Sequence, residues 1–465
     1  MVVSAVRFPS EARSESGGPL CTNALECVGI YFNTEQSPLN PDNHEYSYVY
    51  GTLPLFSTRA VGLVVDQACD ENPAPGAVLL RWILLGIREP CMPGTYLGYG
   101  GIHLIGRALS TLADLATLIG LALTARLLYD RRTALLAAAL YAFAALPIQH
   151  AHFFVVDSFA TVFVIWTLFF CVKSWRSRAL GWLVPAGLMS GLAVASKVSV
   201  FPLAGIVALA GFYRPRELGG RPGEAAGRQF RFRLSLPAMI ALAASGVLAA
   251  VAFRSAQPYA FTGPGFFGVS IHPAWLNTMQ NIRQIVTGLR DVPFGHQWTA
   301  RAPLVFPWRN MVFWGLGLPL GLTAWVGWAV IGWRALIRKR HWHLLLWIWG
   351  TLFFAYQATQ WVKSMRYLLP IYPVFVLFAA WFARRAARWG LLNLRRSAPH
   401  NRDRPPLDWV RKIAAGFSIL IPPVVLVGAA LWALAFLSIY AQPVTRIEAS
   451  RSIYQEIPTA VVFEP

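Results

Sequence analysis

The chain has 465 residues, of which 56% are hydrophobic and 13% are charged. Soluble globular domains carry about 25% charged residues, so this composition excludes an ordinary soluble protein and indicates a membrane protein. The formal net charge of +20 would suggest a nucleic-acid partner in a soluble chain. In a membrane protein, excess Lys and Arg more often mark cytoplasmic loops, so we expect membrane lipids and no nucleic acid as partners.

Residues 1–107 form the first predicted region, an extracytoplasmic loop region without a membrane span. Residues 77–88 are apolar but contain Arg81 and Arg88, a pattern typical of a helix that lies in the membrane interface. Four cysteines fall in this region, and they permit two disulfides in any of three pairings, or free thiols. These cysteines are Cys21, Cys27, Cys69 and Cys91.

Ten apolar stretches follow, most of them long enough to cross the hydrocarbon core of a bilayer as helices. They predict an all-α, polytopic integral membrane protein with about ten transmembrane helices. Six helices fall in residues 108–253 and four in 310–440, with a long extracytoplasmic loop at 254–309 and the start of a C-terminal extracytoplasmic region at 441–465. The predicted spans are 108–128, 133–147, 157–173, 179–196, 198–213, 234–253, 310–333, 342–360, 367–383 and 413–440.

Lys and Arg are concentrated in alternate loops. One set of loops holds 24 Lys and Arg and 5 acidic residues, whereas the opposite loops and both termini hold 16 basic and 15 acidic residues. Cationic loops resist translocation, so the first set is predicted to be cytoplasmic, which places both termini on the extracytoplasmic side of the plasma (inner) membrane. The basic loops are 129–132, 173–178, 214–233, 334–340 and 384–412.

Ionisable groups collect at helix ends on the predicted outer side. His150, His152 and Asp157 lie at one helix boundary, and Lys197 lies between two apolar stretches. Ionisable residues at membrane depth are costly and suggest function. Each also has a structural interpretation: the histidines as interfacial rings, Asp157 as a residue that complements the helix dipole, and Lys197 as a snorkelling side chain.

Lys363, Arg366 and Tyr367 form a further polar group just before a predicted helix. The two cations lie on the outer side, against the general charge trend, which favours a function over simple anchoring. The long loop 254–309 is aromatic and turn-rich, which is atypical of disorder, and its segment His296, Gln297 and Trp298 could contact a sugar or a lipid. Converging outer loops of this kind could enclose a site for an anionic ligand delivered from the membrane.

The sequence resembles a known family at this point. AALPIQHAHFFVVDSFATVF, followed by GLMSGLAVASKVSVFPL, is similar to the core of membrane-bound glycosyltransferase family 39, whose GT-C-fold members resemble dolichyl-phosphate-mannose protein mannosyltransferases. Other stretches resemble a bacterial branch of that family, and together they cover most of residues 31–460. They are TEQSPLNPDNHEYSYVYGTLPLF, DVPFGHQWTARAPLVFPWRNMVFWGLGLPLG, KSMRYLLPIYP and TRIEASRSIYQEIP.

The resemblance implies inverting transfer of a sugar from a polyprenyl-phosphate donor to an acceptor on the extracytoplasmic face. The candidate roles are then as follows. Asp157 and His152 are the catalytic candidates, which would orient acceptor or donor. The donor phosphate would be held by Lys363, Arg366, Tyr367 and Lys197, and the sugar or acceptor would contact His296, Gln297 and Trp298. We expect no metal-ligand set, and the cofactor stays open between none and a divalent cation.

In that family the catalytic base is an acid, usually in an Asp-Glu pair just after the first transmembrane helix. The resemblance implies that this pair would precede Met1, because residues 1–6 are similar to the stretch that follows it, and Asp70-Glu71 lies in the wrong place to substitute. We therefore expect a fragment that lacks an upstream helix and its base, and that shows no transfer activity alone. The alternatives are a transporter or flippase for a lipid-linked sugar, and a non-catalytic membrane fragment.

Overall fold

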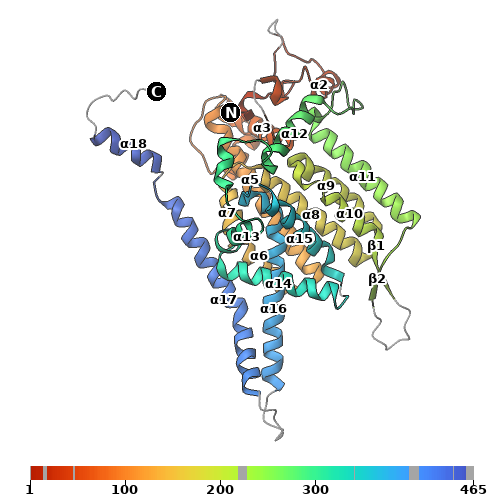
Figure 1. Cartoon of the computed structure of the whole chain (residues 1–465). Coiled ribbons are helices and arrows are strands. Elements are labelled where there is room, and N and C mark those ends of the chain that lie inside the picture. Colours follow the sequence, from red (N-terminus) through yellow and green to blue (C-terminus); the bar gives the residue numbers. More distant parts are fainter. Residues whose placement is uncertain are drawn as a thin grey trace.

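The computed structural model describes residues 2–13, 18–44, 48–217, 228–339, 341–396, 408–443 and 445–456. Within these ranges the chain is almost entirely helical and contains one two-stranded sheet (Figure 1). The expected all-α, multi-pass membrane architecture is thereby confirmed.

Among the described residues, five helical segments are long and apolar enough to cross a membrane. A sixth would form if α6 (Arg131–Ala142) and α7 (Ala145–Ala151), which are bent by 60° relative to each other, count as one broken span. The five belong to α5 (Tyr99–Leu128), α8 (Val156–Ser177), α11 (Leu236–Ala256), η9 with α16 (Met365–Ile371 and Tyr372–Arg396), and α17 with α18 (Asp408–Ala441 and Thr445–Glu456).

The other four predicted spans form helices that fail this test of length and composition. The stretches 179–196 and 198–213 become two short helices with a break at Lys197 between them. By length and composition alone, five or six segments of the described chain are thus full-length spans, and the four remaining predicted spans are shorter or less apolar helices. The shorter elements are η3 (Leu180–Trp182), α9 (Leu183–Ser196), η4 (Val198–Val200), α10 (Leu203–Phe212), η7 (Met311–Gly315), α14 (Leu318–Leu336), η8 (His341–His343) and α15 (Leu344–Thr359).

Helix α8 forms the centre of the bundle, because most of its side chains are buried between α5 and α9. Helix α9 packs closely on α11 through Gly187 and Gly191, one turn apart. A Cβ atom at Gly187 would lie 2.1 Å from the carbonyl oxygen of Ser245, and one at Gly191 would lie 2.3 Å from that of Ala249. Small residues at this spacing let two membrane helices approach each other closely.

The N-terminal region covers one end of the bundle. Its described elements are α1 (Val2–Ala5), α2 (Ala24–Tyr31), η1 (Pro41–His44), α3 (Thr52–Asp66), η2 (Gln67–Cys69) and α4 (Pro75–Leu85). Two disulfides, Cys21–Cys27 and Cys69–Cys91, select one of the three pairings that the sequence left open.

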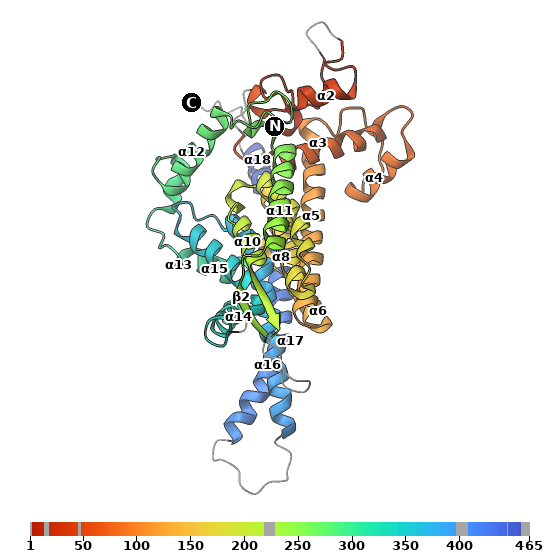
Figure 2. The same cartoon turned by 90° about the vertical axis from the view of Figure 1, so that its right-hand side faces the viewer.

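Helix α4 is the element predicted to lie in the membrane interface. It projects away from the bundle (Figure 2) and exposes Leu79, Trp82 and Ile83, whereas Arg81 is buried and donates to the carbonyl of Arg88. An exposed apolar face beside a buried arginine is typical of a helix in the membrane interface, and this placement of α4 stays a prediction.

The two ends of the molecule differ in the segments that they carry. The N-terminal region and α12 (Pro273–Thr287) lie at one end, and the sheet and the far ends of α16 and α17 lie at the other (Figures 1 and 2). The sheet pairs β1 (Tyr213–Glu217) with β2 (Arg228–Phe232) in antiparallel register at the basic loop 214–233. The loop at 254–309 contains η5 (Pro258–Ala260), α12, η6 (Pro293–Trp298) and α13 (Val305–Asn310).

Candidate active site

Asp157 and Lys197 form a buried ion pair between two helix ends. Asp157 is the second residue of α8 and is 1% exposed, and Lys197, directly after α9, is 8% exposed. The Lys197 Nζ atom donates to the Asp157 carboxylate. Because Lys197 adopts an extended backbone conformation at the break between α9 and α10, its side chain turns back toward the start of α8 instead of facing lipid.

Two residues of the segment η9 complete this cluster. Arg366 donates a hydrogen bond of 2.9 Å to the Tyr50 hydroxyl, and the Lys197 ammonium lies 4.3 Å from the centre of the Tyr367 ring. Asp157 also lies within electrostatic range of Arg366. We call Tyr50, Asp157, Lys197, Arg366 and Tyr367 the cation cluster. With two cations and one carboxylate, the cluster has a surplus of positive charge.

Gly51 explains how Tyr50 reaches this position. The Gly51 amide donates to the carbonyl of Ser196 at 3.2 Å, and a Cβ atom at residue 51 would lie 1.9 Å from the carbonyl oxygen of Ala195. On the other side, the Thr52 hydroxyl donates to the carbonyl of Ala256 at 2.6 Å. Residues 51 and 52 therefore lie between the ends of α9 and α11. The backbone at residue 51 lies so close to α9 that only glycine, which has no Cβ atom, fits there.

Two cavities flank the cation cluster. The first, of about 410 Å³, is lined by Leu146, Gln149, His150, Phe153, Val155, Trp298, Phe306, Asn310, Lys363, Ser364, Met365 and Arg366. The second, of about 570 Å³, is lined by Val49, Tyr50, Lys197, Val198, Ser199, Met279, Ile282, Arg283, Val286, Thr287, Tyr356, Gln357, Gln360 and Tyr367. No Asp or Glu of the described chain belongs to either lining.

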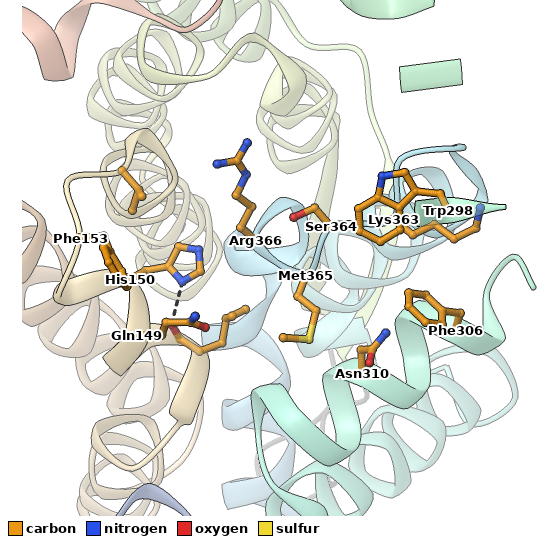
Figure 3. A pocket seen from close by; sticks show the side chains of 12 residues that line it. Gln149, His150, Phe153, Trp298, Phe306, Asn310, Lys363, Ser364, Met365 and Arg366 are labelled. Atoms are coloured by element: carbon orange, nitrogen blue, oxygen red, sulfur yellow. Dashed lines mark hydrogen bonds between the residues drawn. The ribbon is translucent and has the colours of Figure 1, made fainter. Parts of the chain in front are cut away.

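The first cavity brings basic and amide side chains from three parts of the chain together (Figure 3). The His150 ring lies at its wall, and its Nδ1 atom is 3.0 Å from the carbonyl oxygen of Leu146. If Nδ1 carries the proton that this carbonyl accepts, Nε2 is the acceptor of the neutral ring. His150 also lies within electrostatic range of Asp157, Lys197 and Arg366.

Lys363 occupies the opposite wall of the first cavity. It is 5% exposed, its Nζ atom donates to the carbonyl of Trp361 at 3.2 Å, and burial lowers the pKa of its ammonium group. Figure 3 shows Lys363 and Arg366 extending in different directions from their segment. The two predicted phosphate ligands therefore share a cavity without converging on one point inside it.

Six of the nine residues given a site role in the sequence analysis fall into two groups. Asp157, Lys197, Arg366 and Tyr367 meet in the cation cluster, while Lys363 and Trp298 line the first cavity. The indole Nε1 atom of Trp298 is buried without a hydrogen-bond partner among the described residues.

Three predicted residues lie outside both cavity linings. His152 stacks on Tyr440 of α17 with ring centres 4.3 Å apart. His296 lies on an exposed surface with its Nε2 atom 3.3 Å from the Asp291 carboxylate, and Gln297 donates to the carbonyl of Phe294 at 2.9 Å. Their predicted roles therefore have no support from a shared cavity.

Tyr50, Gln149 and Asn310 are site residues that sequence reasoning did not single out. Tyr50 stands directly before the glycine of the YGTLPLF stretch, and Gln149 stands directly before His150. Among the described residues, no group of three or more His, Cys, Asp or Glu side chains is arranged to hold a metal ion.

Comparison with solved structures gives relatives of low sequence identity. The apo oligosaccharyltransferase of Archaeoglobus fulgidus matches with 15% identity and a TM-score of 0.47, over 87% of this chain and 51% of that chain. ArnT from Cupriavidus metallidurans, bound to undecaprenyl phosphate, matches with 17% identity and a TM-score of 0.40, over 73% of this chain and 62% of that chain. The chain thus spans about half the length of the archaeal enzyme.

The family comparison concerns the part of the chain that carries Asp157 and Lys197. No curated protein sequence matches the chain. The family model of dolichyl-phosphate-mannose-protein mannosyltransferase matches residues 100–215, from α5 to β1. Over these residues the chain is similar to that family, in agreement with the resemblance seen in its sequence.

Proposed function

We propose that this chain belongs to an inverting glycosyltransferase that takes a sugar from a polyprenyl-phosphate donor and passes it to an acceptor at the extracytoplasmic membrane face. The observation that carries this proposal is the surplus of positive charge at the cation cluster, where Lys197 is buried and Arg366 is half-buried, between two cavities whose described linings contain no acid. Such a site favours an anion, and a lipid phosphate is the anion that a membrane delivers at this depth. The family match over residues 100–215 supports the transferase class.

The cation cluster suits the chemistry of the leaving group. An acceptor oxygen attacks the anomeric carbon, the bond from that carbon to the phosphate oxygen breaks, and the electron pair stays on the departing polyprenyl phosphate. Negative charge on that oxygen grows as the bond breaks, so a fixed cation stabilises the transition state more than the ground state. Arg366 offers a planar fork for phosphate oxygens, while Lys197 acts as a point charge.

Asp157 then serves as a positioning residue. Its carboxylate holds the Lys197 ammonium at the helix break. The Tyr50 hydroxyl accepts a hydrogen bond from Arg366 and so orients the guanidinium group. The reaction also needs a base for the acceptor proton. In the family that the sequence resembles this base is an acid, and the described walls of the two cavities contribute none.

Two observations support the proposed position of the site on the extracytoplasmic side: the end of the bundle where its second cavity lies, and the distribution of basic loops. The second cavity is lined by Tyr50 and by Arg283 of α12, at the end of the bundle where the N-terminal region lies (Figure 1). The described parts of the basic loops, among them β1, β2 and the adjoining ends of α16 and α17, lie toward the opposite end (Figures 1 and 2), which the positive-inside rule assigns to the cytoplasm.

A transporter would need charged groups along a path through the bilayer. Asp114 of α5, one of the two charged residues in the interiors of the predicted spans, instead accepts a hydrogen bond of 2.7 Å from Tyr141 of α6. This contact joins neighbouring helices, and we therefore prefer the transferase.

Binding of the lipid carrier tests the proposal without requiring the base. The purified chain is titrated with a polyprenyl phosphate and, separately, with the uncharged polyprenol of the same length, and complexes are quantified by native mass spectrometry. We expect the phosphate to bind at least tenfold more tightly, a difference of about 1.4 kcal/mol or more. Equal binding of phosphate and polyprenol would contradict a phosphate site.

Two conservative variants separate phosphate recognition from membrane anchoring. Arg366→Lys keeps the charge but removes the planar fork, so we expect at least a tenfold loss of polyprenyl-phosphate affinity with unchanged expression. Lys363→Arg should behave similarly if Lys363 also contacts the phosphate. If both variants bind polyprenyl phosphate as tightly as the original chain, the shape of the cationic group does not matter at these positions. Lys363 and Arg366 would then be membrane anchors and not phosphate ligands.

A further inference from the structure

A third cavity lies at the opposite end of α16, outside the candidate active site. It has a volume of about 730 Å³ and is formed by α6, α14, α16 and α17. Arg384 follows Arg366 by 18 positions, which is roughly 27 Å along a helix at about 1.5 Å per residue. The lining is Tyr129, Asp130, Thr133, Val330, Trp381, Phe382, Arg384, Arg385, Ala386, Arg388, Trp389, Leu392 and Ser418.

The charge of this cavity favours an anion. Arg384, Arg385 and Arg388 face a single carboxylate, that of Asp130. The Asp130 Oδ1 atom already accepts hydrogen bonds from the Thr133 amide at 2.7 Å and from the Thr133 hydroxyl at 3.0 Å. Burial opposes ionisation of Asp130, but these bonds and the nearby Arg384 and Arg388 hold its pKa below the ordinary value. With Asp130 ionised and engaged, the lining retains a surplus of two positive charges.

Two donors in this lining have no partner within the described part of the chain. The Arg384 Nε atom and the Tyr129 hydroxyl are both buried and make no hydrogen bond there. Buried donors of this kind are normally satisfied by protein, water or ligand. Because these two atoms are closed to solvent, a phosphate in the cavity would instead meet the terminal guanidinium nitrogens of Arg384 and the exposed guanidinium of Arg388.

The surroundings of the cavity are those of a membrane surface. Trp381 and Trp389 belong to its wall, and Trp side chains are enriched where headgroups meet the hydrocarbon region. Next to Ser418 on α17, Phe417 is 69% exposed, and Leu392 on α16 is also exposed. In a ligand with an anionic headgroup and long apolar chains, the headgroup could contact the arginines of the lining and the chains could contact the exposed apolar side chains of α16 and α17.

We propose that this cavity binds the phosphodiester headgroup of an anionic phospholipid, with its phosphate at Arg384 and Arg388 and its acyl chains along the exposed apolar face of α17. Basic pockets between membrane helices are suited to such headgroups. The bound lipid would hold α16 and α17 together at the end that the charge distribution assigns to the cytoplasm. This inference does not depend on the proposed transferase function.

The test compares lipids that differ in charge alone. The purified chain in neutral detergent is titrated with phosphatidylglycerol, or with phosphatidylcholine of the same acyl chains, and adducts are counted by native mass spectrometry. We expect one phosphatidylglycerol to bind at least tenfold more tightly than phosphatidylcholine. Glycerol 3-phosphate, which carries the phosphate without the chains, should not displace it at equal concentration.

Paired variants locate the site. R384Q/R388Q should abolish the preference for phosphatidylglycerol. The matched control R338Q/R395Q removes two exposed arginines at the same end of the molecule but outside the lining, and should keep the preference. Equal loss in both pairs would mean unspecific attraction and would overturn the site.

Two results with the unaltered chain would also overturn the proposal, whatever the folding of the variants. One is equal binding of the two lipids. The other is displacement of phosphatidylglycerol by glycerol 3-phosphate, which would identify a site for a soluble phosphate ester.

Discussion

The hydroxyl of Tyr50 accepts a hydrogen bond of 2.9 Å from Arg366, which lies 316 positions later in the chain. This bond joins the N-terminal region to η9 beside the buried Asp157–Lys197 pair. It links the two cavities, because Tyr50 lines the second and Arg366 lines the first.

Tyr50→Phe is expected to weaken polyprenyl-phosphate binding while keeping the ring. The substitution removes the acceptor that orients Arg366, and hydrogen bonds to charged groups contribute roughly 1.5–3 kcal/mol. We therefore expect roughly a tenfold or greater loss of affinity in the native mass spectrometry titration. Tyr99→Phe, at an exposed tyrosine far from the cluster in sequence, is the control and should leave affinity unchanged.

The Asp157–Lys197 pair should show strong coupling in thermal unfolding. Asp157→Asn or Lys197→Met alone leaves one buried charge without its partner, which typically costs about 3–5 kcal/mol. The double variant removes both charges, so we expect it to unfold at a higher temperature than either single variant. Additive losses in this double-mutant cycle would show that the two side chains do not interact.

Gly51→Ala should destabilise the chain and weaken carrier binding together. The added methyl group would collide with the carbonyl of Ala195, so the segment that carries Tyr50 must move away from α9. Gly29→Ala is the matched control, because a Cβ atom at residue 29 meets nothing within 4 Å. If the Gly51 variant has the same unfolding temperature and the same affinity for the carrier as the Gly29 variant, the close approach of residue 51 to α9 is not required.

The sidedness of the chain can be tested by labelling single cysteines in intact cells. Gln280→Cys lies on an exposed position of α12, and Ser177→Cys lies on an exposed position at the basic end. We expect a membrane-impermeant maleimide to label residue 280 from outside and to label residue 177 only after the cells are opened. The reverse pattern would invert the topology and move the proposed site to the cytoplasmic face.

The membrane character of the fold was predictable because composition and long apolar stretches reflect the bilayer directly. The division of an apolar run into separate helices was not, because hydropathy does not show where a helix ends inside such a run. The stretch around Lys197 illustrates this limit: two short helices, α9 and α10, meet there at a break. The disulfide pairing was likewise open, since spacing alone does not choose among three arrangements.

The site was partly predictable because buried charges are rare in membrane helices and stand out in the sequence. Asp157, Lys197 and Arg366 were singled out in this way, with the adjacent Tyr367, and they lie together in the cation cluster, while their proposed roles stay predictions. The contribution of Tyr50 was not, because it depends on a contact across most of the chain.

The neighbouring histidines show a second limit of sequence reasoning. His150 and His152 are two positions apart near the end of α7, so on a helix their side chains point in roughly opposite directions. The packing of α7 places His150 at the first cavity and His152 against Tyr440. That choice depends on neighbouring helices and cannot be read from local sequence.

The central claim is that the cation cluster binds the phosphate of a polyprenyl-phosphate carrier. An electron cryomicroscopy structure of the chain in a lipid nanodisc with a polyprenyl phosphate tests it most directly. We predict phosphate density within hydrogen-bond distance of Arg366 and Lys197, with the polyprenyl chain leading away toward the membrane. Density for the carrier phosphate at Arg384 and Arg388 instead, with none at the cation cluster, would contradict the claim.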